Sequence, residues 1–278
     1  MLWDLALMSV VPMVFVLIIN KLQWGPVKKY FRTVNMALVP WCVVMPHYLW
    51  TKWLPIQIPL SLDQKIVAVF LISGFWALFK EEVFKSKGWL VAVIQNMALA
   101  ALFYYFMKPL LQTMKAWQAA LIVGGAAIVT SKVSAIMSKV NIESEWWLAP
   151  TMSLITLGGA GFYFFFSGSI LLANLVFCLC SGLLIYSLLN IKNSNYMAFN
   201  CYFPLNLIAL MLAAYFYYEI DPAAVTVLAS PFVVFLLWSY LPLSVLPTRI
   251  AWISFVVLSG APIAAAIYHV YRVGGPLY

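Results

Sequence analysis

The sequence predicts an all-α, polytopic helical membrane protein with about ten transmembrane helices. Three observations predict this class. Of the 278 residues, 65% are hydrophobic and only 9% are charged, whereas a soluble domain carries about 45–50% apolar and about 25% charged residues. The apolar residues form long unbroken runs instead of the short alternating segments of a barrel. The charged residues fall at the ends of these runs or between them. Soluble, fibrous and disordered proteins are therefore excluded.

Each predicted helix follows from one apolar run. The first run begins near Asp4 and is followed by Lys21, the reverse of the charge order in a cleaved signal peptide, so we expect a retained first helix. Pro40 and Pro46 interrupt the second run, the third is short, and Gly168 is the expected cut within the long stretch from 146 to 190. Of the remaining runs, only 116–136 contains a charged residue, Lys132 near its end. The ten runs cover residues 3–20, 34–51, 66–79, 89–107, 116–136, 146–166, 169–190, 197–218, 223–241 and 250–270.

The basic residues predict the orientation. With ten spans and the N-terminus outside, eleven of the sixteen Lys and Arg residues fall in cytoplasmic loops and five on the other side, which agrees with the positive-inside rule. Tryptophans such as Trp89, Trp117, Trp147 and Trp252 lie near the predicted ends, where they would anchor the helices at headgroup depth. The chain has no N-x-S/T acceptor. We therefore expect an integral protein of the bacterial inner (plasma) membrane with both termini outside.

The chain has no room for a soluble domain. Ten spans of roughly 20 residues use about 200 residues, so residues 1–278 form a single transmembrane domain. Residues 111–128 (LQTMKAWQAALIVGGAAI) and 246–263 (LPTRIAWISFVVLSGAPI) match at seven positions with an offset of 135. This spacing favours two five-helix halves, 1–140 and 141–278, of inverted topology, as in many transporters. Chance matching in a chain rich in Ala, Leu and Ile is the alternative.

Polar side chains inside the predicted spans are the candidate site residues, because such groups are costly in lipid. The adjacent amides Gln95 and Asn96 are the first candidates for substrate binding. Asn174, Asn206 and His47 complete the set. The four amides also have a purely structural interpretation, since Asn and Gln join membrane helices by hydrogen bonds.

We expect no catalytic residue, no metal site and no cofactor. All eight acids lie at predicted ends or in loops, and the four cysteines lie in apolar runs without a metal-binding spacing. The sequence contains no H-E-x-x-H, P-loop or G-x-S-x-G pattern. The acidic pair Glu81–Glu82, followed by Lys85 in E-E-x-x-K, resembles the E-E-x-x-x-R motif of CAAX-type intramembrane proteases, with the basic residue one position nearer. That family also needs downstream histidines in spans, and here none lies between His47 and His269.

These observations favour a multi-pass carrier or flippase for a small or lipid-linked substrate, and not an enzyme. The end of each half, a small-residue helix after a short polar turn, resembles the ten-helix drug/metabolite-type transporters. Those carriers usually have a Glu in that turn, where this chain has Lys115 and Arg249. The first alternative is a non-catalytic subunit of a larger membrane complex. The second is an intramembrane enzyme acting on lipid, with His47, His269 and the Glu81–Glu82 pair as its acid–base groups. The expected partners are the lipid bilayer and, under the first alternative, protein subunits. Nucleic acid is not expected, because the basic residues form no dense stripe.

Overall fold

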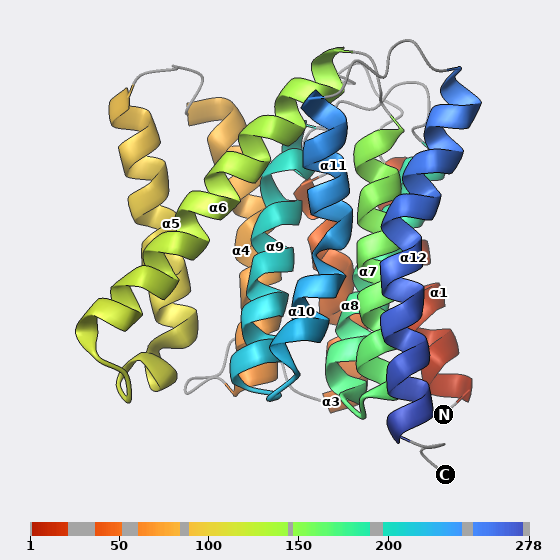
Figure 1. Ribbon diagram of the computed structural model, residues 1–278, viewed down its shortest axis with the longest axis horizontal. Coiled ribbons are helices and arrows are strands. Elements are labelled where there is room, and N and C mark those ends of the chain that lie inside the picture. Colours follow the sequence, from red (N-terminus) through yellow and green to blue (C-terminus); the bar gives the residue numbers. More distant parts are fainter. Residues whose placement is uncertain are drawn as a thin grey trace.

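Every regular element in the described part of the chain is a helix (Figure 1), which confirms the all-α prediction. The structure is a computed structural model, and it describes residues 2–21, 37–51, 61–83, 89–143, 147–189, 197–240 and 247–274. The elements in chain order are α1 (Leu2–Lys21), η1 (Val39–Val43), α3 (Val44–Thr51), α4 (Leu62–Val83), α5 (Trp89–Leu111), α6 (Ala116–Glu143), α7 (Leu148–Phe166), α8 (Ile170–Leu189), α9 (Met197–Phe216), α10 (Pro222–Leu228), α11 (Ser230–Tyr240) and α12 (Thr248–Gly274).

Helices overlap each of the ten apolar runs, and two of the runs are split. The run 34–51 becomes the 3₁₀-helix η1 followed by α3, with Pro40 inside η1. The run 223–241 becomes α10 and α11, and the break precedes Pro231, which has no N–H to continue the helical ladder. Gly168 ends α7 with a φ of +84°, a conformation that glycine adopts without strain, and the chain turns there into α8.

Four helices are long and apolar enough to cross a membrane: Trp89–Leu111, Ala116–Ser138, Ile170–Leu188 and Thr248–Val273. Four shorter apolar helices accompany them, at Val10–Ile19, Gln64–Ala77, Pro150–Phe166 and Asn200–Phe216. The first set has the roughly 20 residues of a full span, whereas the apolar helices of the second set are 10–17 residues long.

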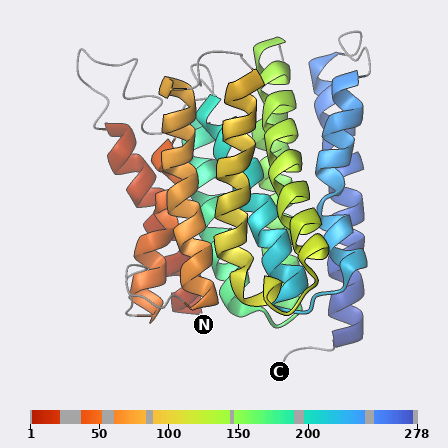
Figure 2. The same ribbon diagram turned by 90° about the vertical axis from the view of Figure 1, so that its left-hand side faces the viewer.

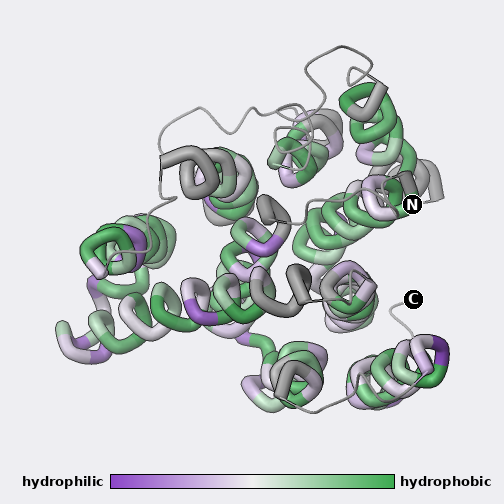
Figure 3. Tube along the Cα trace, turned by 90° about the horizontal axis from the view of Figure 1, so that it is seen from above, coloured by the Kyte–Doolittle hydropathy of each residue, from purple (hydrophilic) through white to green (hydrophobic). Residues whose placement is uncertain are grey.

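The core of the bundle forms around two buried helices. Helix α9 packs against α4 and α6, while α8 packs against α7, α1 and η1. Every residue from 200 to 207 is buried, so this part of α9 is enclosed on all faces. In contrast, only 22% of the apolar window of α5 is buried and 22% of that of α12, against 61% for α8. Helices α5, α6 and α12 therefore form the periphery (Figure 3), and many of their large apolar side chains are exposed.

Glycines allow the closest helix contacts. A Cβ built on Gly159 of α7 would overlap Ile263 of α12, and one on Gly182 of α8 would lie 2.6 Å from the Cys42 sulfur of η1. Gly74 of α4 faces the backbone carbonyl oxygen of Ala37 in the same way. At these positions an added side chain would meet the neighbouring segment, so glycine allows the close approach.

The bundle has two distinct ends. The start of α1 and the end of α12 lie at the same end, which is the lower one in Figure 1 and also in Figure 2. The hairpin of α5 and α6 leans away from the other helices (Figure 1). Trp89 and Trp117 are 75% and 59% exposed at the first turns of α5 and α6, as expected for anchors. Trp147 is instead buried against Phe255, with ring centroids 6.2 Å apart.

Candidate functional site

Asn206 is the most enclosed of the predicted site residues. It is the tenth of the twenty residues of α9 and is 0% exposed. Neither the Nδ2 nor the Oδ1 atom of its amide has a hydrogen-bond partner among the described residues. A buried amide without a partner costs about 1–3 kcal/mol, so this position is unfavourable for stability alone.

Pro204 adds a second irregularity to the same stretch of α9. Proline has no N–H, so the helical hydrogen bond to the carbonyl of residue 200 is missing. This proline was not among the predicted site residues. The signal was present, since Pro204 and Asn206 stand two residues apart near the middle of one apolar run.

Asn96 on α5 and Asn206 on α9 lie at similar depth in the bundle. The two helices run in the same direction (Figure 1) and touch near their ends, where the Tyr217 hydroxyl donates to the Phe106 carbonyl oxygen at 3.1 Å. Asn96 precedes Phe106 by ten residues and Asn206 precedes Tyr217 by eleven. At about 1.5 Å per residue, both amides lie roughly 15–17 Å from that contact, which is near mid-depth.

Gln95 and Asn96 have a different environment from Asn206. Both are half-buried on α5, whose packing partners are α6 and α4. The Asn96 Nδ2 donates to the Ala92 carbonyl oxygen at 2.8 Å, within its own helix. This amide therefore satisfies its donor locally, while its Oδ1 is buried without a hydrogen-bond partner among the described residues. The structure does not place the α5 pair in the enclosed stretch of α9.

His47 and Asn174 lie on a third part of the interior. They are 1% and 5% exposed, on α3 and α8. The segments meet where the Cys42 thiol donates to the Cys178 carbonyl oxygen at 3.4 Å. His47 follows Cys42 by five residues, and Asn174 precedes Cys178 by four residues, along antiparallel segments. Both side chains therefore lie about 6–8 Å from this contact in the same direction, toward the lower end in Figure 1.

Several buried hydroxyl groups were not predicted as candidates. Those of Ser73, Thr130 and Thr156 donate to carbonyl oxygens three or four residues back at 2.7 Å, so they are satisfied within their helices. The hydroxyl of Ser259 on α12, which is 0% exposed, and that of Ser230 at the start of α11 have no hydrogen-bond partner among the described residues. Nothing in the sequence distinguishes Ser259 from the serines that bond to their own helix.

The acid–base groups of the enzyme interpretation are not brought together. Glu81 and Glu82 are in the last residues of α4, at the upper end in Figure 1. His47 on α3 and His269 on α12 lie toward the lower end, and His269 is exposed. The acidic pair and the histidines therefore stand at opposite ends of the bundle.

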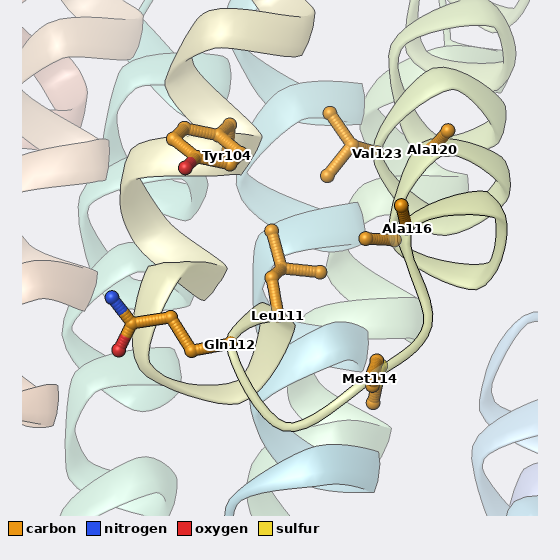
Figure 4. A pocket seen from close by; sticks show the side chains of 8 residues that line it. Tyr104, Leu111, Gln112, Met114, Ala116, Ala120 and Val123 are labelled. Atoms are coloured by element: carbon orange, nitrogen blue, oxygen red, sulfur yellow. The ribbon is translucent and has the colours of Figure 1, made fainter.

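An open groove of about 470 Å³ lies between α5 and α6 where the two helices meet. Leu111 occupies its centre, with Tyr104 on α5 and Ala116, Ala120 and Val123 on α6 around it (Figure 4). The lining is mainly apolar, and the groove faces the periphery of the bundle because Tyr104 is 53% exposed. No sequence pattern predicts this groove, because it depends on the angle between two helices.

The long apolar helices, the apolar periphery and the polar groups enclosed in the interior together define the class: an integral, multi-pass helical membrane protein. No protein-family model, curated protein or solved structure matches the chain.

Proposed function

We propose that the protein is a ten-span carrier or flippase, whose site lies around Asn206 at the middle of α9. The ten spans would be the eight apolar helices together with the split pairs η1–α3 and α10–α11. The shared end of α1 and α12 supports an even number of crossings. With both termini outside a bacterial inner membrane, the basic residues obey the positive-inside rule.

Two inverted halves, 1–140 and 141–278, are part of this proposal. The matched segments begin the exposed helices α6 and α12, which run in opposite directions (Figure 1), as inverted topology requires. The matched Trp117 and Trp252 are both exposed at the first turn, and a Cβ on Gly125 or Gly260 would meet nothing within 4 Å. The halves differ in packing, since α6 contacts α9 whereas α12 contacts α7.

The observation that carries the proposal is the unpartnered amide of Asn206. It lies at mid-depth on a helix that packs against α4 and α6 of the first half, and carriers bind substrate at this depth between halves. An amide offers both a donor and an acceptor to one ligand. The substrate would therefore present a neutral polar group, such as a hydroxyl or amide, on a small or lipid-linked molecule.

Replacement of Asn206 by leucine tests the proposal. Leucine removes the unsatisfied polar atoms at similar volume, so the variant should be at least as stable as the natural chain while losing transport. Asn96→Leu is the matched control at the same depth, and it should retain transport. Flux would be measured in proteoliposomes, by osmotic swelling with uncharged polyols and amides and by dithionite quenching of NBD-labelled phospholipid.

Three results would count against the proposal. One is the absence of flux of both kinds with the natural chain. Another is equal flux through the natural chain and Asn206→Leu. The third is a large loss of stability in Asn206→Leu, which would make the amide a structural hydrogen-bonding group.

A specific observation favours a second candidate, a non-catalytic subunit of a membrane complex. Small residues normally bring membrane helices together, yet a Cβ on Gly124, Gly125 or Gly260 would meet nothing within 4 Å in this chain. These glycines lie on the peripheral helices α6 and α12. Under this function, Gly125→Leu would release co-purifying chains after mild detergent extraction without changing the stability of the isolated chain.

A further inference from the structure

The groove between α5 and α6 has an apolar lining and a positively charged rim. Its apolar side is formed by Leu111, Val123 and the alanines of α6 (Figure 4). Lys115 is exposed in the turn between Met114 and Ala116, which both line the groove. The turn is held in place because the Lys115 backbone N–H donates to the Gln118 Oε1 at 3.2 Å.

Lys108 stands on the same side as the groove. It is four residues after Tyr104 and four before Gln112, both of which line the groove, and residues at this spacing share a helix face. The Gln112 N–H donates to the Lys108 carbonyl oxygen at 3.3 Å, so the helical geometry continues to the turn. Lys108 is exposed, and its ammonium group can reach the rim.

The charge of the whole hairpin is one-sided. From Trp89 to Glu143 the sequence has four lysines and one acid, Glu143. That acid ends the 28-residue helix α6 at the end opposite the turn, so no carboxylate of the hairpin lies beside Lys108 or Lys115. The positive end of the α6 dipole also points at this turn. An anion at the rim is therefore favoured by the charges that lie at this end of the hairpin.

Trp117 fixes the depth of the rim in a bilayer. It is 59% exposed, two residues after Lys115, and exposed tryptophans at helix ends lie at headgroup level. The lysines are therefore at the depth of lipid phosphates. The groove beyond them is at the depth of acyl chains.

We propose that this groove binds one anionic phospholipid, with an acyl chain against Leu111 and Val123 and the phosphate between Lys108 and Lys115. The continuity of the apolar groove with the two cations selects a lipid over a soluble phosphate, which would use only the rim. This inference is independent of the proposed transport function, since binding is measured without flux.

The test is lipid binding to the full-length chain in detergent, by native mass spectrometry and by the shift in thermal unfolding. Dioleoyl phosphatidylglycerol should bind and stabilise the chain more than dioleoyl phosphatidylcholine. Glycerol 1-phosphate, which lacks acyl chains, should give no shift. The variant Lys108→Gln/Lys115→Gln should bind phosphatidylglycerol more weakly by about fivefold for each lysine removed, as expected for a basic residue at a membrane surface.

Two further variants distinguish the effect of the rim charges on lipid binding from the effect of the apolar groove. Lys132→Gln/Lys139→Gln removes the same charge from the far part of α6 and should leave binding unchanged. Ala120→Phe fills the groove at an exposed position without altering charge, and it should abolish the preference for phosphatidylglycerol. The proposal is overturned by equal binding of the two lipids, by an equal loss in both lysine pairs, by unchanged binding in Ala120→Phe, or by stabilisation with glycerol 1-phosphate alone.

Discussion

Replacing Gly159 by alanine tests how closely α7 packs against α12. A Cβ at residue 159 would overlap Cγ2 of Ile263 and lie 3.1 Å from its Cδ1 and 3.4 Å from its Cβ. Because a β-branched side chain in a helix has one strongly preferred χ1 rotamer, Cγ2 of Ile263 cannot rotate away without cost, and Cβ does not move with χ1. The helices must separate or the isoleucine must shift as a whole. Gly158 is the matched control, since the nearest atom to its Cβ would be the Cys180 sulfur at 3.9 Å.

The expected difference follows from two opposing effects. Overpacking of a close contact costs about 1–3 kcal/mol, while exchange of glycine for alanine in a helix gains roughly 1 kcal/mol. Gly159→Ala should therefore lower the free energy of unfolding by about 0–2 kcal/mol. Gly158→Ala should raise it by up to about 1 kcal/mol. The assay is reversible unfolding in mixed detergent micelles titrated with SDS.

A double-mutant cycle identifies Ile263 as the cause. Ile263→Ala alone should cost about 2–5 kcal/mol, because it leaves a cavity. Combined with Gly159→Ala, it should cost less than the sum, with a coupling of roughly 0.5–3 kcal/mol, because the new methyl group occupies the vacated space. Equal stability of Gly158→Ala and Gly159→Ala, or strict additivity in the cycle, would refute the packing argument.

Two further substitutions probe the lower end of the bundle. Tyr217→Phe removes the hydroxyl that donates to the Phe106 carbonyl oxygen at 3.1 Å and should destabilise the chain by about 0.5–1.5 kcal/mol in the same SDS titration; no change would mean that α5 is not held to α9 there. Asp221→Ala removes the side chain that accepts from the Ala223 N–H at 3.1 Å, ahead of Pro222 at the first turn of α10. It should cost about 0.5–2 kcal/mol, whereas Asp221→Asn keeps the cap and should remain near the natural stability; equal losses in both variants would contradict the capping role.

The positions of the helices could be predicted because each depends on local sequence. Long apolar runs with charged ends define most of them, and prolines and glycine explain the interruptions. Pro40 lies where the second run becomes a 3₁₀-helix, Pro231 follows the break between α10 and α11, and Gly168 makes the turn from α7 to α8. These residues act through their own backbone dihedrals and missing donors, so their effects do not depend on tertiary neighbours.

The ranking of the polar residues could not be predicted in this way. Gln95 and Asn96 were the first candidates because they are adjacent and far from charge, yet α5 is a peripheral helix. Burial of Asn206 depends on which helices surround α9, and the direction of an amide depends on the carbonyl groups within its reach. The Asn96 amide donates to the Ala92 carbonyl oxygen of its own helix. No pattern of residue types shows that the Asn206 amide makes no such bond.

Two features near the middle of α9, within three residues of each other, lower the stability of the chain. Pro204 removes a helical hydrogen bond, and the Asn206 amide is buried without a partner in the described chain. A chain selected only to pack would gain about 1–3 kcal/mol by placing an apolar side chain at residue 206. A subunit with a purely structural role gains nothing from a buried amide without a partner, whereas a carrier needs a polar group to which its substrate can hydrogen-bond. Higher stability together with lost transport in Asn206→Leu is therefore the outcome that distinguishes the two functions. If the amide were a structural hydrogen-bonding group, the same variant would be less stable than the natural chain.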